Sequence, residues 1–235
     1  MISTRYILKN PLDVLVASFG GVGTTFLSQA IGRFQRLNDP RDLDGYKHCP
    51  VPPIFGRPIL KVIYVVGNPV LAAASLFRRG YQAGQAGKLQ YSKMLRKFPD
   101  QGLSLTNYAI RGRDRFLFQE HFDAWTKEFV FYPTLVVKYE AIHDSISRIA
   151  EFLQLPAEFV DGFPPQKERN STTDSMDLQT SKGLFDMYGG LTRVIEKLPS
   201  VYELAAYKSQ FSAISDRRYW IGTARDVFWE FFKQQ

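Results

Sequence analysis

The stretch Asp13-Val-Leu-Val-Ala-Ser18-Phe19-Gly20-Gly21-Val22-Gly23-Thr24-Thr25 decides the fold. Its first six residues form an apolar run rich in β-branched side chains, which is typical of a buried strand, and a glycine-rich turn follows at once. From Phe26 to Leu37 the apolar residues recur at steps of three and four, which predicts a helix with one buried face. The stretch therefore predicts a strand, a glycine turn and a helix, in that order.

The same unit recurs further along the chain. Residues Leu60–Val66 read as a strand buried on both faces. Asn68 and Pro69 then supply an N-cap and a first-turn proline for a helix over Val70–Arg79. The second unit predicts that this strand lies in the same sheet as the first.

A third unit begins at Thr134–Lys138, another apolar run, and a helix closed by Pro156 follows it with Ile142 and Leu153 on its buried face. Strands that alternate with helices indicate an α/β fold, with a central parallel sheet flanked by helices and joined by right-handed crossovers. We find no internal repeat and no low-complexity linker, so we expect one domain over residues 1–235.

Two remaining regions carry weaker patterns. Residues 79–104 are rich in glycine and in basic residues, and we expect a partly helical excursion or a lid there. One long helix is predicted over Thr106–Glu128, because Tyr108, Phe116, Phe122 and Trp125 can share a core face. The C-terminal third is expected to be mainly helical.

Composition narrows the classes of function. The chain has 235 residues, of which 45% are hydrophobic, so it can bury a large core. Lys+Arg 30 against Asp+Glu 23 gives a net charge of +7, which favours an anionic ligand. Cys49 is the single cysteine, which excludes an internal disulfide and a cysteine-cluster metal site and favours the reducing cytoplasm. No apolar run is long enough for a membrane span, so we expect no membrane partner.

The basic stretches Lys88–Lys97 and Arg111–Arg115 are compatible with a nucleic-acid footprint. Solvated helix faces, or a rim around an acceptor site, explain them as well, and the sequence contains no named nucleic-acid motif. We therefore expect no nucleic-acid partner.

The glycine turn is a candidate phosphate-binding loop. The backbone N–H groups of Gly20, Gly21, Val22 and Gly23 can converge on an anion at the positive end of the helix dipole, and the hydroxyls of Thr24 and Thr25 add donors. The alternative is a tight turn that binds nothing. A nucleoside-triphosphatase loop needs a lysine directly after its last glycine, and Thr24 stands there instead, which disfavours an ordinary ATPase or kinase.

Three elements in order resemble the sulfotransferases that use 3′-phosphoadenosine 5′-phosphosulfate (PAPS), which have a P-loop-like fold. Residues Ser18–Leu27 are similar to that family's 5′-phosphosulfate loop. Residues Val62–Pro69 with Ser75 are similar to its 3′-phosphate element. Trp125 to Leu153, through Val137-Lys138-Tyr139-Glu140, is similar to its strand ending in Tyr-Glu and the helix after it. The resemblance spans residues 13–155.

The resemblance implies transfer of a sulfuryl group from PAPS to a hydroxyl or amine of a small-molecule acceptor, with 3′-phosphoadenosine 5′-phosphate (PAP) as product and no metal. Residues 20–25 would hold the 5′-phosphosulfate and Ser75 the 3′-phosphate. Lys167, Arg169 and Asn170 fall where the family places a basic loop over the 3′-phosphate. A solvated surface loop is the alternative for that segment.

A fourth element, Tyr46-Lys47-His48-Cys49-Pro50, is similar to the Lys-Thr-His-Leu-Pro of cytosolic sulfotransferases. By that match His48 is the candidate general base. The alternative is a histidine that only caps a loop. His121 and His143 lack such a context, and we expect them to be structural or exposed.

Two departures from the family pattern remove cations. Gly21 stands where the family usually has the loop Lys, and Gly67 where it has the 3′-phosphate Arg. Arg57, Arg78 and Arg79, together with the basic loop at 167–170, are the available substitutes. The departures leave two alternatives open, a catalytically inactive PAPS/PAP-binding protein and a divergent P-loop kinase or ATPase.

Overall fold

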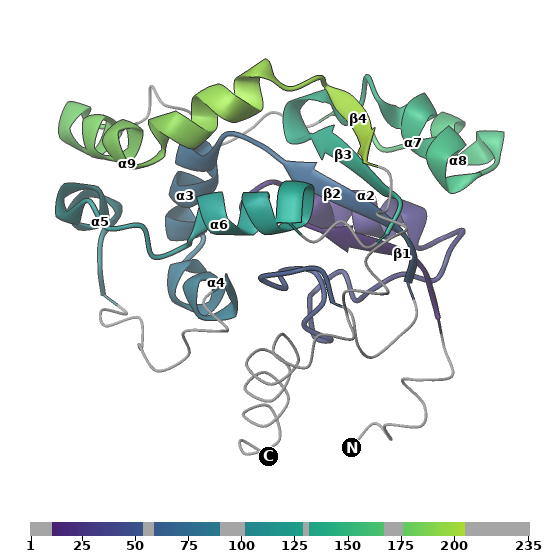
Figure 1. The fold of residues 1–235 in the computed structure, drawn as a ribbon, viewed down its shortest axis with the longest axis horizontal. Helices are drawn as coiled ribbons and strands as arrows, with labels where there is room; N and C mark the ends of the chain where they lie inside the picture. Colours follow the sequence, from purple (N-terminus) through teal and green to yellow (C-terminus); the bar gives the residue numbers. More distant parts are fainter. Residues whose placement is uncertain (1–10, 54–58, 90–101, 129–131, 167–175, 205–235) are drawn as a thin grey trace, which may run out of the picture.

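The computed structural model describes residues 11–53, 59–89, 102–128, 132–166 and 176–204. Four strands form an open sheet in the order β1-β2-β3-β4 (Figure 1). They are β1 (Leu12–Ala17), β2 (Ile59–Val66), β3 (Thr134–Lys138) and β4 (Val201–Leu204). The first three are parallel, with Val16 opposite Ile63 and Ile63 opposite Leu135. The predicted α/β class and all three predicted strands are confirmed.

Strand β4 corrects one expectation. It runs antiparallel to β3, with Val137 opposite Val201, so the sheet is not wholly parallel. It lies in the C-terminal third, where the described residues also include the 20-residue helix α9 (Leu178–Lys197). The strand is four residues long and only partly buried, so it lacks the continuous apolar run that marks β1 to β3.

The outer edge of β1 is covered by the segment Arg36–Asn38. The carbonyl of Arg36 accepts hydrogen bonds from the N–H groups of Asp13 (2.9 Å) and Val14 (3.2 Å), and Leu37 forms a parallel bridge to Val14. The buried Asn38 side chain completes the edge, because it accepts from Val16 N at 2.8 Å and donates to Val16 O at 3.1 Å. This segment therefore acts as a very short extra strand.

This edge segment fixes where the chain changes direction across the sheet. After β1 the chain passes outward to Leu37, and it then returns across β1 to reach β2. In parallel sheets of this kind, a reversal of strand order opens a crevice at the carboxyl ends of the strands concerned. Here those ends are Ala17 of β1 and Val66 of β2, followed by the glycine turn and by Gly67.

One group of helices packs around α2 (Thr24–Ile31), which lies behind the strands in Figure 1. It includes α7 (Ile146–Leu153) and α8 (Ala157–Asp161), which follow β3 and the short 3-10 turn η3 (Tyr139–Ala141). Phe34 packs edge-on against Phe159, with ring centroids 5.9 Å apart. Helix α2 ends at Ile31, with Gly32 as its C-cap, so the predicted continuation to Leu37 is wrong.

A second group of helices follows β2: α3 (Pro69–Arg78), α4 (Gln82–Leu89), α5 (Leu105–Arg111), α6 (Phe118–Asp123) and the π-helical turn η2 (Ala124–Glu128). Helix α9 (Leu178–Lys197) packs on α3 and α5, and α6 crosses in front of the strands (Figure 1). Asn68 caps α3 as predicted, accepting from the N–H groups of Val70 and Leu71. None of the described helices is both long and apolar enough to cross a membrane.

The long helix predicted over residues 106–128 is wrong as a single element. Gly112 (φ 59°) and Leu117 (φ 52°) adopt left-handed conformations that separate α5 from α6. The core side chains of this region, Tyr108, Phe116, Phe122 and Trp125, are nevertheless all buried, as expected. Within residues 79–104, α4 accounts for the helical part, and residues 90–101 lie outside the described residues.

Candidate functional site

The glycine turn is packed closely against α3 and α4. Gly20 (φ 93°), Gly21 (φ 73°) and Gly23 (φ 63°) all have left-handed backbones. A Cβ at Gly21 would lie 2.5 Å from the carbonyl oxygen of Ala72, and a Cβ at Gly20 would lie 2.6 Å from Gln85 Nε2. Gly21 therefore has a steric reason to be glycine, and a lysine in its place would displace α3.

The end of the turn opens toward solvent at the start of α2. Gly23 is the N-cap residue, no side chain caps the helix there, and no acidic residue lies in its first turn. Gly23 and Thr25 are exposed, whereas Val22 and Thr24 are buried. This helix end can attract an anion, because its dipole is positive and no carboxylate of its own first turn opposes it.

Lys47 supplies a cation at this turn. Its side chain is buried, and its ammonium donates hydrogen bonds to Thr25 Oγ1 and to the carbonyl of Pro40, both at 2.8 Å. Both partners are uncharged, so within the described part of the chain the ammonium is bonded to neutral oxygens alone. Burial lowers the pKa of Lys47 to about 8, opposed by the charge of Asp42. The sequence motifs did not identify Lys47 as a site residue, although it directly precedes His48 in the segment Tyr46–Pro50.

Asp42 and Lys88 lie beside Lys47. The buried Asp42 carboxylate accepts from the backbone N–H of Lys47 at 2.9 Å and from Lys88 Nζ at 2.6 Å. Lys88 belongs to α4, as does Gln85, whose side-chain amide donates to the carbonyl of Phe19 in the glycine turn at 3.0 Å. Helix α4 thus holds both the turn and the segment that carries Lys47.

His48 is anchored to the residue that begins the turn. Its Nδ1 lies 2.8 Å from the carbonyl oxygen of Ser18, and because a carbonyl only accepts, Nδ1 carries the proton and Nε2 keeps its lone pair. Burial lowers the pKa of His48 to about 4, with the charge of Asp42 opposing that change. The imidazole is therefore neutral near pH 7 and has the protonation state of a general base.

The predicted 3′-phosphate residue, Ser75, is buried on α3. It lies three residues beyond Ala72, the residue against which Gly21 packs, so it lies one helical turn further along the same face. Arg79 is one turn beyond Ser75 and donates from Nε to its carbonyl at 3.1 Å. Its charge contributes to the lowered pKa of Lys47, which brings Arg79 within electrostatic range of the site.

Gly67 follows β2 at the same edge of the sheet. A Cβ there would lie 2.9 Å from Val22 Cγ1, so an arginine in its place would crowd the glycine turn. Arg78 is exposed. Arg57, Lys167, Arg169 and Asn170 were expected to add charge or polar donors, and they lie outside the described residues.

Three half-buried rings gather just after the turn. Phe26 of α2 stacks on His143 with centroids 5.9 Å apart and planes within 8°. Phe163 meets both rings edge-on, 5.8 Å from Phe26 and 5.2 Å from His143. His121, by contrast, is buried under the site and bonded to Tyr64 at 2.9 Å, and burial lowers its pKa to about 3. The described residues contain no cluster of three or more metal-ligating side chains.

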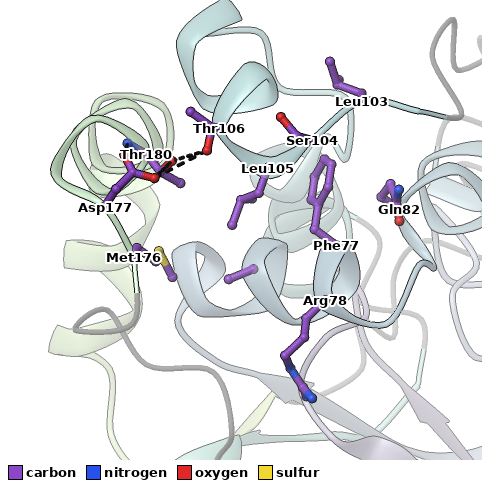
Figure 2. Close-up of a pocket in the computed structure, with 11 residues that line it drawn as sticks. Phe77, Arg78, Gln82, Leu103, Ser104, Leu105, Thr106, Met176, Asp177 and Thr180 are labelled. Carbon is purple, nitrogen blue, oxygen red and sulfur yellow. Dashed lines mark hydrogen bonds between the residues drawn. The ribbon is translucent and has the colours of Figure 1, made fainter.

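A separate cavity of about 410 Å³ lies between α3, the start of α5 and the start of α9, and no residue of the glycine turn lines it (Figure 2). Ala74, Phe77 and Arg78 of α3 line it. Its far wall includes Asp177, which caps α9 and accepts hydrogen bonds from Thr180 and Thr106, as Figure 2 shows. The hydrogen bonds from Thr180 lower the pKa of the Asp177 carboxyl.

Comparison of the chain with protein-family models, with curated proteins and with solved structures finds no match.

Proposed function

We propose that the protein transfers the sulfuryl group of PAPS to the hydroxyl or amine of a small-molecule acceptor, at the carboxyl ends of β1 and β2. One observation carries the proposal: the buried Lys47 ammonium lies on the Thr25 hydroxyl, at the open end of the glycine turn. A buried charge is stable when an opposite charge meets it, and the bonded partners of Lys47 are uncharged. A phosphosulfate at the turn supplies that charge.

The resemblance supports PAPS as the particular anion. The turn and Lys47 would hold the 5′-phosphosulfate. Ser75, with Arg79 one turn beyond it, would hold the 3′-phosphate. Lys47 thus compensates for the lysine that the close approach of Gly21 to α3 excludes. The rings of Phe26 and Phe163 offer an apolar surface for a flat base beside the turn.

The proposed step is an in-line displacement. The acceptor oxygen or nitrogen forms a bond to sulfur while the bond between sulfur and the bridging phosphate oxygen breaks. Nε2 of His48 takes the acceptor proton, and PAP leaves with the electron pair of the broken bond. Lys47 and the backbone N–H groups of the turn stabilise the charge that grows on the leaving phosphate. By analogy with phosphoryl transfer, positioning and charge stabilisation provide most of the rate.

The experiment is a transfer assay with PAPS and three acceptor classes, a phenol, a primary alcohol and a primary amine, with PAP release as the readout. We expect turnover with at least one class. His48→Ala should lower kcat by about a hundredfold or more, since a positioned general base contributes at least that much. The affinity of the same variant for PAP should stay within about twofold of wild type, because His48 contacts the acceptor side of the reaction.

Other outcomes would replace the proposal. If the protein binds PAP and no acceptor class is sulfated, the protein is a PAP-binding protein without transfer activity. Wild-type turnover in His48→Ala would remove His48 from the step. If ATP with magnesium binds and PAP does not, the protein is a divergent kinase or ATPase.

A further inference from the structure

The carboxylate at the centre of this site is Asp42, a residue outside every motif of the resemblance. Its side chain is 3% exposed, and each of its two oxygens has a different partner: Oδ1 accepts from the Lys47 N–H and Oδ2 from Lys88 Nζ. Its backbone is left-handed (φ 62°), a conformation that aspartate adopts more readily than most residues with a Cβ. The two hydrogen bonds to its oxygens hold this carboxylate in place.

The charged and titratable groups around Asp42 come from three elements. Lys88 comes from α4, and Arg79, at the end of α3, acts on Lys47. The remaining groups belong to the same loop as Asp42: Asp39, Asp44, Lys47, His48 and Cys49. Lys47 feels two cations, Lys88 and Arg79, and two carboxylates, Asp42 and Asp39, of which Asp42 has the larger effect. The buried Asp42 carboxylate is bonded to the Lys47 N–H at 2.9 Å, so it is the acidic group placed to oppose the cost of burying the Lys47 charge.

We propose that Asp42 is a positioning residue that sets the charge of this site: it keeps the Lys47 ammonium protonated and stabilises the imidazolium on His48. The imidazolium half of this inference rests on the proposed function, because His48 becomes charged only when it takes the acceptor proton. The Lys47 half concerns the free protein. In both halves Asp42 acts through another residue and contacts neither cofactor nor acceptor.

Lys88 tunes this effect. It forms the ion pair with Oδ2 of Asp42, and its own side chain is 44% exposed. The ion pair neutralises part of the carboxylate's field, and the Lys88 charge itself repels Lys47. Removing the Lys88 charge should therefore raise the pKa of Lys47, whereas removing the Asp42 charge should lower it.

The test is an NMR titration of the Lys47 side chain in the full-length free protein. Asp42→Asn keeps an oxygen for the Lys47 N–H and removes the charge, so the Lys47 midpoint should fall by about one pH unit, the lower end for loss of a nearby opposite charge. Asp44→Asn is the matched control. Asp44 is a buried carboxylate of the same loop that accepts from the N–H groups of Asp39 (2.8 Å) and Tyr46 (3.3 Å), and its loss should leave the midpoint unchanged.

An unchanged or raised Lys47 midpoint in folded Asp42→Asn overturns the proposal. If that variant does not fold, Lys88→Met decides instead: the midpoint should rise, and a fall or no change overturns the proposal. In the transfer assay, Asp42→Asn should lower kcat at least about tenfold and move the alkaline limb of the pH profile to lower pH, with kcat unchanged in Asp44→Asn. Absence of any turnover in wild type would contradict the proposed function, while the Lys47 titration would still decide the charge-setting role.

Discussion

Two regions of this protein hold a charged group largely away from water, Asp114 half-buried and Lys47 buried, and they surround it differently. Asp114 lies between α5 and α6, where its carboxylate accepts hydrogen bonds from Tyr188 Oη at 2.6 Å and from the N–H groups of Phe116 at 2.8 Å and Phe118 at 3.2 Å. Lys47, at the glycine turn, has a hydroxyl and a carbonyl as its bonded partners. Loss of hydration disfavours the charged form of both groups. It raises the pKa of the Asp114 carboxyl and lowers the pKa of Lys47 to about 8.

The difference separates a structural charge from one that can serve a ligand. The partners of Asp114 come from α6, from the turn before it and from α9, so the carboxylate joins segments distant in sequence. These hydrogen bonds give the Asp114 carboxylate a structural role. Among the described residues no carboxylate is bonded to the Lys47 ammonium, so an anion at the turn would lower its energy. A buried charge whose bonded partners are neutral is therefore a candidate site for an anion.

The largest expected effect concerns the structural region. Asp114→Ala leaves the N–H groups of Phe116 and Phe118 without their acceptor and breaks the bond from Tyr188 Oη, which keeps its bond to Tyr108 Oη at 2.5 Å. The free energy of unfolding should fall by about 3 kcal/mol or more. Urea denaturation measures it. Tyr188→Phe, which removes one donor, should cost about 1 kcal/mol. A loss below about 1 kcal/mol in Asp114→Ala would mean that the carboxylate is not structural.

A smaller effect is expected at the glycine turn. Gly21→Ala combines a left-handed backbone (φ 73°) with a contact at 2.5 Å to the Ala72 carbonyl oxygen, and it should destabilise the protein by about 2–3 kcal/mol. Gly45 has the same φ of 73° and nothing within 4 Å of an added Cβ. Gly45→Ala therefore measures the cost of the left-handed backbone alone, about 1 kcal/mol of unfolding free energy. Equal losses in the two variants would mean that the turn is not packed tightly on α3.

The pH dependence of PAP affinity tests whether the charge of Lys47 serves a ligand, as that of Asp114 does not. Lys47 is charged below a pKa of about 8 and becomes neutral as the pH rises through that value, so the affinity should weaken above pH 8, by about tenfold per pH unit. Calorimetry between pH 6 and pH 10 measures the slope. Lys47→Arg should remove the alkaline decline, because arginine stays charged over this range. A decline that persists in Lys47→Arg would assign it to another group.

The sequence predicted those elements whose pattern is local. Strands β1 to β3 are continuous apolar runs, and Asn68 with Pro69 marks the start of α3, so each could be read without tertiary information. The break at Leu117 could not, because leucine is a favourable helix residue and nothing in the local sequence predicts its left-handed φ of 52°. Gly112, the left-handed C-cap of α5, was a local signal that the apolar spacing outweighed. The spacing of apolar residues alone predicts one uninterrupted helix across that break.

The site was predictable in part for the same reason. The glycine turn and His48 stand in recognisable motifs, and the structure joins them through the Ser18 carbonyl. Lys47, Asp42 and Lys88 meet there because the chain passes around the outer edge of β1 at Asn38 and returns over the turn. No periodicity encodes such a return, so the missing cation could not be located from the residues that flank the glycines.

The most direct measurement is calorimetric titration of the full chain with PAP, with 5′-AMP and magnesium ATP as control ligands. The account predicts a micromolar Kd for PAP, at least tenfold weaker binding of 5′-AMP, and at least tenfold weaker PAP binding in Lys47→Met, about 1.4 kcal/mol for each loss. Lys88→Met, which removes a cation already paired with Asp42, should stay within about threefold of wild type. Undetectable PAP binding, a preference for magnesium ATP, or wild-type affinity in Lys47→Met would contradict the account.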